Sequence, residues 1–443
     1  MPLLPYLAPM KAPHRVVIVG GGFAGLNCAK SLANDDRFEV TLIDRQNHHL
    51  FQPLLYQVAT ASLSAVEIAR SLRAILDDSP NVSVLLDKVT QIDDGRKAVI
   101  TENGHYSYDS LVLATGARTS YFGKDEWAKH TFGLKTLEDS RRIRHQVLNA
   151  LERAERTSNP AEKKRLMTVA IVGGGPTGVE LAGAFADLVR RALKSDYRRI
   201  DVSDFRIILI QSGDRLLKPF AEDHSEYTRE RLETLGVEII LGPRVDNVRE
   251  HYLHLDDGRE IEAETLIWAA GVAASPLTGC FDCPRDRGGR IEVEPPLTVP
   301  GHPHVFAAGD LVSLVDHDGK SVPGLAPAAM QMGKHVAKVL REDLRLQKTR
   351  YKDRYLELRP AFSYRDKGIM AIIGKNAAVA QANKLKLKGF PAWLAWLFIH
   401  LAFLVGFRNK LAVLLSWAFS YLFDKPAARV FSIPESAEPP KGD

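Results

Sequence analysis

Three glycines at fixed spacing after an apolar run could bind the phosphates of a dinucleotide. The run is Val16–Val19, and the glycines of this G-x-G-x-x-G pattern are Gly20, Gly22 and Gly25. Such glycines allow a tight turn, a close approach of backbone to a pyrophosphate, and close packing of the next helix, whose N-terminus attracts phosphate. Asp44 ends a second strand, Glu39–Ile43, 19 positions after Gly25, where a ribose-binding carboxylate is expected. The alternative is a glycine turn that serves packing alone, but the combination favours dinucleotide binding.

The same pattern recurs in the middle of the chain. Thr168–Val172 leads into a second G-x-G-x-x-G, formed by Gly173, Gly175 and Gly178. Gln211 follows the expected strand Phe205–Ile210, in the position that Asp44 holds in the first copy. Glu180 lies on the first turn of the second helix. It is either a functional acid or an ordinary first-turn acid stabilised by the helix dipole.

Each copy continues through short strands with turn signals and ends in small residues. Asn81–Tyr108 and Val237–Leu255 have the alternation of small antiparallel layers. A further apolar strand then ends in Ala114, Thr115 and Gly116 in the first copy, and in Gly271 in the second. This duplication predicts an α/β fold with two Rossmann-like dinucleotide-binding domains.

Other segments have simpler periodicities. Helices are expected at Ser64–Leu76, Leu137–Glu155 and Val179–Leu193, a polar connector at Arg156–Lys164, and a helix from about Pro327. His48 and His49 could bind a metal, but no further ligand lies at a suitable spacing, so packing near the cofactor is favoured and no metal site is expected.

The composition indicates a packed globular protein. The 443 residues suggest two or three domains, with 45% hydrophobic and 26% charged residues. The net charge of +5 comes without a basic, aromatic-rich stretch, so no nucleic-acid partner is expected. The three cysteines are Cys28, Cys280 and Cys283, which fits a reducing compartment. Cys280 and Cys283 are interpreted as a coincidence in a surface loop, and residues 1–13 lack the features of a signal peptide.

The C-terminal segment differs from the rest of the chain. Phe390–Gly406 has 17 residues without Asp, Glu, Lys or Arg, and Leu411–Phe423 adds a second apolar run of 13. A spanning hairpin needs about 17–25 residues in each helix. Packing as a soluble helix pair or at a dimer interface is a further alternative. Helices lying in the membrane interface fit the Trp, Tyr and basic residues best, so we expect attachment to a lipid bilayer surface.

A third signal, Gly309-Asp310, follows the short strand Val305–Ala308. A turn-capping aspartate is the alternative for Asp310. With both glycine loops present, the chain resembles the type II NADH dehydrogenases, which are non-proton-pumping NADH:quinone oxidoreductases. The resemblance covers nearly the whole chain through the following segments: Phe51–Ala59, Gly173–Glu180, Trp268–Val272, Ala307–Asp310, Ala326–Gly333 and Gly406–Lys410.

The resemblance implies a hydride relay from NADH through FAD to a membrane quinone. Asp310 would then bind the ribityl chain of FAD, and Glu180 would contact the nicotinamide end of NADH. Gln331 is linked to the quinone in the family pattern Ala-Gln-x-x-x-Gln, but this chain has Pro327 in place of the first glutamine. A plain helix residue is the alternative for Gln331. Either ubiquinone or menaquinone is compatible with the sequence.

The choice of nicotinamide nucleotide depends on Gln211. A carboxylate in this position would bind the ribose hydroxyls and repel a 2′-phosphate, whereas glutamine carries no charge. Arg215 lies near enough in the sequence to help bind a phosphate. NADH is the predicted donor, and NADPH remains an alternative.

The predicted domains are an FAD-binding domain at residues 11–160 and 290–345, an NAD(P)H-binding domain at 165–285, and a C-terminal helical membrane-attachment region at 346–443. The expected location is the cytoplasmic face of the cell membrane, with a homodimer compatible with the sequence. Two alternative functions remain: a reductase of another electron carrier, and a flavoprotein that senses NADH. The missing cysteines beside the flavin argue against a sulfide:quinone oxidoreductase.

Overall fold

The chain forms two compact units, each built from separate stretches of sequence. The computed structural model describes residues 12–193, 196–316, 319–423 and 429–430. Unit 1 comprises Met1–His49, Arg70–Arg118 and Val272–Lys367, and unit 2 comprises Leu50–Ala69, Thr119–Gly271 and Gly368–Asp443. These limits differ from the predicted domain limits: residues 50–69 and 119–160 group with the second glycine loop, and residues 272–285 and 346–367 group with the first.

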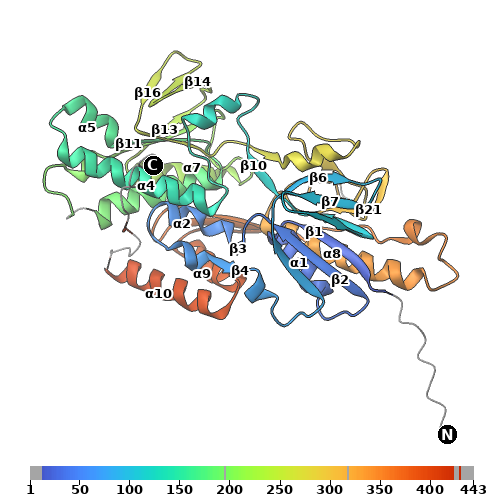
Figure 1. Cartoon of the computed structure of the whole chain (residues 1–443). Helices are drawn as coiled ribbons and strands as arrows, with labels where there is room; N and C mark the ends of the chain where they lie inside the picture. The colour runs from blue at the N-terminus through green and yellow to red at the C-terminus, as the bar shows by residue number, and fades with distance from the viewer. Residues whose placement is uncertain (1–11, 194–195, 317–318, 424–428, 431–443) are drawn as a thin grey trace, which may run out of the picture. The chain divides into compact units, whose positions relative to one another are not determined.

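Unit 1 contains a six-stranded sheet in the order β20-β21-β9-β1-β2-β5. Its strands are Thr298–Val299 (β20), His302–Ala307 (β21), Ser110–Leu113 (β9), His14–Val19 (β1), Phe38–Asp44 (β2) and Val82–Leu86 (β5). All neighbours pair in parallel except β20 with β21. The helices α1 (Phe23–Leu32) and α8 (Ala326–Leu346) pack side by side (Figure 1). Buried Val, Ile and Leu of the sheet and helices form the core of this unit.

The antiparallel layer of unit 1 is smaller than predicted. It contains Val89–Asp93 (β6), Ala98–Thr101 (β7) and His105–Ser107 (β8). Val82–Leu86, which we expected in this layer, instead extends the main sheet as its edge strand. The prediction was wrong there because a short apolar run suits a parallel edge as well as an antiparallel one.

Unit 2 repeats the parallel sheet with four strands in the order β13-β12-β11-β17. These are Val237–Leu241 (β13), Arg206–Gln211 (β12), Thr168–Val172 (β11) and Thr265–Trp268 (β17). An antiparallel layer follows, formed by Val245–Arg249 (β14), Tyr252–Leu255 (β15) and Glu260–Glu262 (β16). The helices are Leu55–Ala59 (α2), Ala65–Ile68 (α3), Leu137–Arg156 (α4), Pro160–Leu166 (α5), Pro176–Asp187 (α6) and Glu222–Thr234 (α7). The predicted α/β fold is therefore confirmed.

The C-terminal part of unit 2 is a β-meander followed by two helices. The elements are Ile369–Ile372 (β23), Ala378–Ala382 (β24), Leu385–Gly389 (β25), Phe390–Phe403 (α9) and Phe407–Phe423 (α10). Helix α9 packs on the meander and also contacts α10 (Figure 1). The remaining short strands are His48–Leu50 (β3), Ala69–Ser71 (β4), Ala117–Thr119 (β10), Val272–Ala274 (β18), Ile291–Glu292 (β19) and Val312–Ser313 (β22).

Three of the predicted elements were wrong in part. The helix expected at Ser64–Leu76 stops at Ile68, and its last carbonyl groups accept hydrogen bonds from the side chain of Asn409 on α10. The connector expected at 156–164 contains α5, which Asn159 caps and Pro160 begins. The helix expected to reach Leu193 ends as α-helix at Asp187 and continues as a π-helical turn.

Candidate functional site

The first glycine loop joins β1 to α1 at the carboxyl edge of the unit 1 sheet. Gly20 has φ +107°, and a Cβ there would collide with the carbonyl group of Ala114. A Cβ at Gly25 would collide with the carbonyl oxygen of Gly20, so only glycine lets α1 approach this closely. Gly22 differs, because no heavy atom lies within 4 Å of the position of its Cβ. The protein itself therefore requires glycine at 20 and 25, whereas Gly22 leaves space beside the backbone.

Asp44 ends β2 beside this loop. Its carboxylate accepts hydrogen bonds from the backbone N–H of Gly21 at 2.5 Å and of Gln46 at 2.7 Å. Burial raises the pKa of Asp44 above its usual value, and these two hydrogen bonds oppose that shift. The structure thus places the predicted ribose-binding acid directly against the first glycine loop.

The other predicted FAD residues lie at the same edge of the same sheet. Ala114, Thr115 and Gly116 follow β9, and Asp310 follows β21, which pairs in parallel with β9. Parallel strands bring their carboxyl ends to one edge, where ligands of such sheets bind. The N-cap of α1 is Gly22, which has no side chain to cap the helix, so the first N–H groups remain available to a phosphate. This loop, its open glycine and the nearby carboxylates fit a flavin dinucleotide.

The second glycine loop reproduces this geometry in unit 2. Gly173 has φ +115°, and a Cβ there would lie 2.8 Å from the carbonyl carbon of Ala269. A Cβ at Gly178 would collide with the carbonyl oxygen of Gly173, while Gly175 again has no atom within 4 Å of its Cβ position. The two loops therefore share the same pattern of required and open glycines.

Gln211 takes the structural place of Asp44. Its Oε1 accepts a hydrogen bond from the backbone N–H of Gly174 at 2.8 Å, as the Asp44 carboxylate does from Gly21. Because one amide oxygen replaces a carboxylate, the loop is held in the same way without a negative charge. Arg215 donates a hydrogen bond to the carbonyl oxygen of Lys218 at 3.1 Å.

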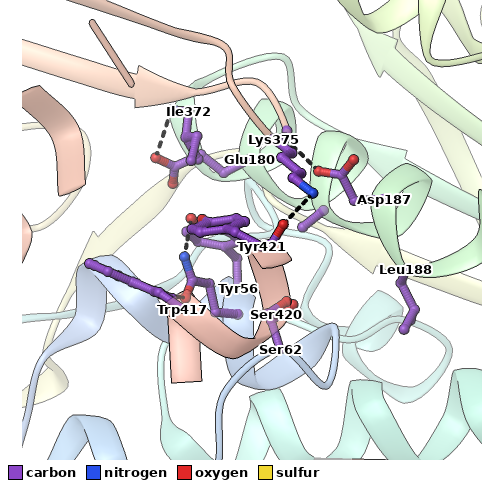
Figure 2. A pocket seen from close by; sticks show the side chains of 13 residues that line it. Tyr56, Ser62, Glu180, Asp187, Leu188, Ile372, Lys375, Trp417, Ser420 and Tyr421 are labelled. Atoms are coloured by element: carbon purple, nitrogen blue, oxygen red, sulfur yellow. Dashed lines mark hydrogen bonds between the residues drawn. The ribbon is translucent and has the colours of Figure 1, made fainter. Parts of the chain in front are cut away.

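Glu180 lies on α6 and faces a cavity within unit 2 (Figure 2). One carboxylate oxygen lies 3.5 Å from the backbone N–H of Ile372, which donates to it. Burial raises the pKa of Glu180 to about 8, and the hydrogen bond from Ile372 opposes this shift only in part. A pKa of about 8 leaves the carboxyl group mostly protonated at neutral pH. The sequence-based placement of Glu180 on the first turn was wrong, because α6 begins at Pro176 and its first turn contains no acidic residue.

The cavity is lined by side chains from four stretches of unit 2. They include Tyr56, Asp187, Lys375, Trp417 and Tyr421 (Figure 2). Lys375 donates from its backbone to Asp187 at 2.6 Å and from Nζ to the carbonyl oxygen of Tyr421 at 2.8 Å. Burial, and secondarily the charge of Glu180, raise the pKa of Tyr56 well above its usual value. No sequence pattern predicted this cavity, because its walls come from segments far apart in the chain.

One hydrogen-bond chain connects helix α10 to helix α2 at this cavity. Trp417 Nε1 donates to Oε1 of Gln57 at 2.8 Å, and Gln57 Nε2 donates to the hydroxyl of Tyr56 at 2.7 Å. Ser416 also donates to the carboxylate of Glu67. Helix α10 therefore contributes to the internal structure of unit 2 through one face.

Gln331 lies in α8, within unit 1, and its amide makes two hydrogen bonds. Nε2 donates to the carbonyl oxygen of Arg365 at 3.0 Å, and the backbone N–H of Arg365 donates to Oε1 at 2.9 Å. Pro327 occupies the first turn of this helix, which suits proline. The visible role of Gln331 is to hold the backbone at Arg365.

The remaining candidate ligands have structural roles. The buried His49 ring hydrogen-bonds the carbonyl oxygen of Gly21 at 3.0 Å and packs edge-on against Phe23. Among the residues that the structure describes, no group of three or more His, Cys, Asp or Glu could hold a metal ion. Cys280 and Cys283 are partly buried free thiols that pack against the core of unit 1. The N-terminal segment considered for a signal peptide lies largely outside the described residues.

Helices α9 and α10 expose many apolar side chains while burying three tryptophans. Phe398 is 74% exposed, Phe407 82% and Leu422 76%, whereas Trp393, Trp396 and Trp417 are buried. In the described part of the chain, no helix combines the length and apolar character that crossing a membrane requires. Two basic residues of β25, just before α9, contact other residues of unit 2. Lys386 pairs with Asp223 at 3.3 Å, and Lys388 lies over the ring of Tyr227.

Comparisons with known proteins agree with this architecture. Residues 14–333 match the family model described as pyridine nucleotide-disulphide oxidoreductase, and residues 367–425 match the NDH2 C-terminal domain. The chain is 41% identical to the type II NADH:quinone oxidoreductase Ndh of Mycobacterium tuberculosis, over 92% of this chain and 88% of that protein. It is 30% identical to the internal alternative NAD(P)H-ubiquinone oxidoreductase A1 of Arabidopsis thaliana, over 96% and 88% of the two chains. The structure of NDH2 from Plasmodium falciparum in complex with NADH has the same fold, with a TM-score of 0.85, 22% identity, and coverage of 93% of this chain and 99% of that one.

Proposed function

Because this chain belongs to the type II NADH:quinone oxidoreductases, a family of non-proton-pumping flavoproteins, we propose that its two glycine loops divide the work between two dinucleotides. The loop of unit 1 binds FAD, and the loop of unit 2 binds NADH. The observation that carries the proposal of two dinucleotide sites is the shared loop geometry: each loop has an open central glycine and a side chain at the end of the next strand that accepts a backbone N–H.

In unit 1, the residues around the first loop hold the flavin dinucleotide. The N-terminus of α1 faces the phosphates, Asp44 binds a ribose, and Asp310 binds the ribityl chain. Ala114, Thr115 and Gly116 supply backbone at the same sheet edge. When bound, FAD accepts a hydride and passes electrons onward, while the protein orients the reactants and excludes water.

The test of this assignment separates the two half-reactions. Stopped-flow absorbance follows the bleaching of the flavin by NADH, and then its recovery when a membrane quinone is added. We expect both steps, with no dependence on a proton gradient. Protein that is colourless and stays so after incubation with flavin would contradict the assignment of FAD to unit 1. A flavin that is bleached by NADPH but not by NADH would contradict NADH as the donor.

In unit 2, Glu180 contacts the nicotinamide end of NADH. Two observations support this role: the carboxyl group lines a cavity, and burial raises its pKa to about 8. Donation of a hydride leaves positive charge on the nicotinamide, which a carboxylate stabilises better than a neutral acid does. Glu180 is neutral below pH 8 and charged above it, so the rate of flavin reduction by NADH should rise as the pH increases through about 8.

The Glu180→Gln variant is expected to reduce flavin about tenfold more slowly at high pH, the effect of losing one charged contact. Glutamine does not titrate, so the increase in the rate of flavin reduction near pH 8 should disappear. The variant should reduce its flavin at the low-pH rate over the whole pH range. Stopped-flow measurements from pH 6 to pH 10 test this, with Ser420→Ala in the same cavity as the matched control. Unaltered NADH kinetics in the glutamine variant would contradict the assignment of Glu180 to the NADH site.

Gln211 sets the weak discrimination between NADH and NADPH. It can bind a ribose hydroxyl but does not repel a 2′-phosphate, and the NAD(P)H named for the Arabidopsis relative is consistent with such tolerance. We propose NADH as the main donor and NADPH as a secondary one, with Arg215 favouring the latter.

The Gln211→Glu variant should raise the preference for NADH over NADPH by about tenfold or more, because like charges brought together cost more than 1 kcal/mol. The glutamate keeps an acceptor for the N–H of Gly174, so the loop should stay intact. The comparison is kcat/KM for both nucleotides, with Arg215→Ala expected to weaken NADPH alone. A glutamate variant that retains the wild-type ratio would show that Gln211 does not face the ribose.

On the quinone side, we propose a positioning role for Gln331 and attachment of helices α9 and α10 to a lipid bilayer surface. Gln331 acts through the backbone of Arg365, which its amide binds from both sides. The exposed apolar residues of α9 and α10 support peripheral attachment to the membrane in which the quinone is dissolved. The proposed location is the cytoplasmic face of the cell membrane. A homodimer is compatible with this arrangement.

A further inference from the structure

Phe122 is an exposed aromatic residue held in an unusual backbone conformation. Its side chain is 70% exposed, and its φ of +54° lies in the left-handed region. Bulky side chains rarely adopt this region, so an unconstrained surface phenylalanine would not be expected there. The surrounding structure must therefore fix this residue in place.

The contacts of Trp268, the last residue of β17, account for this constraint. Its Nε1 donates to the carbonyl oxygen of Ser120, two positions before Phe122 in the chain, at 2.9 Å. The Trp268 ring also contacts three aromatic rings, with centroid distances of 5.6 Å to Tyr121, 6.5 Å to Phe122 and 5.3 Å to Trp127. The loop formed by residues 120–127 is thus attached to the carboxyl end of β17 on both sides of Phe122.

The Phe122 ring lies directly over Gly271. A Cβ at Gly271 would lie 2.5 Å from Cζ of the ring, and Gly271 itself has φ +80°. The backbone N–H of Ser120 also donates to the carbonyl oxygen of Gly271 at 3.4 Å. A glycine is therefore required beneath the ring, which remains open to solvent on its other side.

The strand order of unit 2 shows which half of a dinucleotide this ring would meet. In the order β13-β12-β11-β17, Gln211 at the end of β12 lies on the adenosine side of the glycine loop. Gly271 follows β17, on the opposite side of β11, at the point where the strand order reverses. A dinucleotide bound across this edge extends from the end of β12 toward the end of β17.

We propose that the Phe122 ring packs against the nicotinamide mononucleotide half of NADH. This inference rests on the assignment of NADH to unit 2 and adds a contact residue to it. The ring shields one side of the nucleotide from water, and the loop fixes the ring before the nucleotide binds, so little side-chain freedom is lost on binding.

The Phe122→Gly variant tests the proposal, because glycine readily adopts a φ of +54° and leaves the backbone undisturbed. We expect the KM for NADH to rise about tenfold, the size of a lost aromatic contact, while kcat at saturating NADH is retained. The inhibition constant of AMP, which has only the adenosine half, should be unchanged, and so should the melting temperature of the holoenzyme. Phe122→Tyr keeps the ring and should bind NADH normally.

Two results would overturn the proposal. Equal weakening of AMP and NADH would mean that the ring supports only the fold of unit 2, and an unchanged KM for NADH would mean that the ring does not touch the nucleotide. A different result would contradict the placement of NADH in unit 2 itself. In that case AMP would not inhibit NADH oxidation by the wild-type enzyme, and NADH would not raise its melting temperature.

Discussion

Replacing Gly175 by alanine should give a folded enzyme that keeps its yellow flavin. NADH should reduce that flavin on the order of a hundredfold more slowly than in the wild-type enzyme. The backbone of Gly175 has φ −76°, and no heavy atom lies within 4 Å of an added Cβ, so alanine fits the protein without strain. The open space is needed only if a pyrophosphate approaches the N-terminus of α6. A methyl group there would displace the phosphates by about 1 Å, and misplacement of that size costs about a hundredfold in rate.

The first loop supplies a matched variant. Gly22→Ala should also fold, because Gly22 is equally open, but this protein should lose its flavin rather than its response to NADH. Visible absorbance, stopped-flow reduction and melting temperature together distinguish the two variants. Gly178→Ala serves as a steric control, since its Cβ would collide with the carbonyl oxygen of Gly173 and should destabilise the fold itself. A Gly175→Ala enzyme with normal NADH kinetics would show that the second loop does not bind the nucleotide.

The sequence predicted the parts of this structure that local constraints determine. The glycine loops, the buried strands beside them and the acid or amide at the end of the next strand follow from steric rules that act over a few residues. Thr168–Val172 and Leu137–Arg156 therefore agree with their predicted limits to within a residue. The position of Gln211 was predicted for the same reason, because it is the counterpart of Asp44 in the second copy.

Contacts between distant segments escaped prediction. Helix α3 ends where Asn409, more than 300 positions further along the chain, binds its carbonyl groups, and no local signal marks that end. The cavity at Glu180 and the position of Phe122 over Gly271 likewise depend on loops that only the folded unit brings together. The engagement of Gln331 with Arg365 was also invisible, because a helical glutamine has the same pattern whether its amide is free or bound.

Helices α9 and α10 show how local and tertiary signals combine in one segment. Apolar composition predicted both helices, but it could not show that Trp396 and Trp417 face inward while other apolar residues face solvent. This division leaves apolar side chains of both helices exposed, and we define the exposed surface of the pair by Phe398, Phe407 and Leu422. The inward face supports the cavity, and the exposed surface is available to a bilayer.

Replacing Phe398, Phe407 and Leu422 together by serine should weaken binding to lipid vesicles by about a thousandfold. Each of these side chains is more than 70% exposed in the protein, and transferring one into an apolar phase contributes roughly 1.5–3 kcal/mol, or at least tenfold in affinity. Flavin content and melting temperature should be retained, because the three side chains contribute little to the core.

Sedimentation with vesicles of neutral and anionic lipid measures this change, and Leu86→Ser, an exposed apolar position in unit 1, is the matched control. Anionic lipid should strengthen binding only modestly, since Lys386 is paired with Asp223 and Lys388 lies over Tyr227. The triple variant should still reduce a water-soluble short-chain quinone, while its activity with long-chain quinone in vesicles falls with its binding. Vesicle binding equal to that of the Leu86→Ser control would show that these three side chains do not attach the protein to lipid.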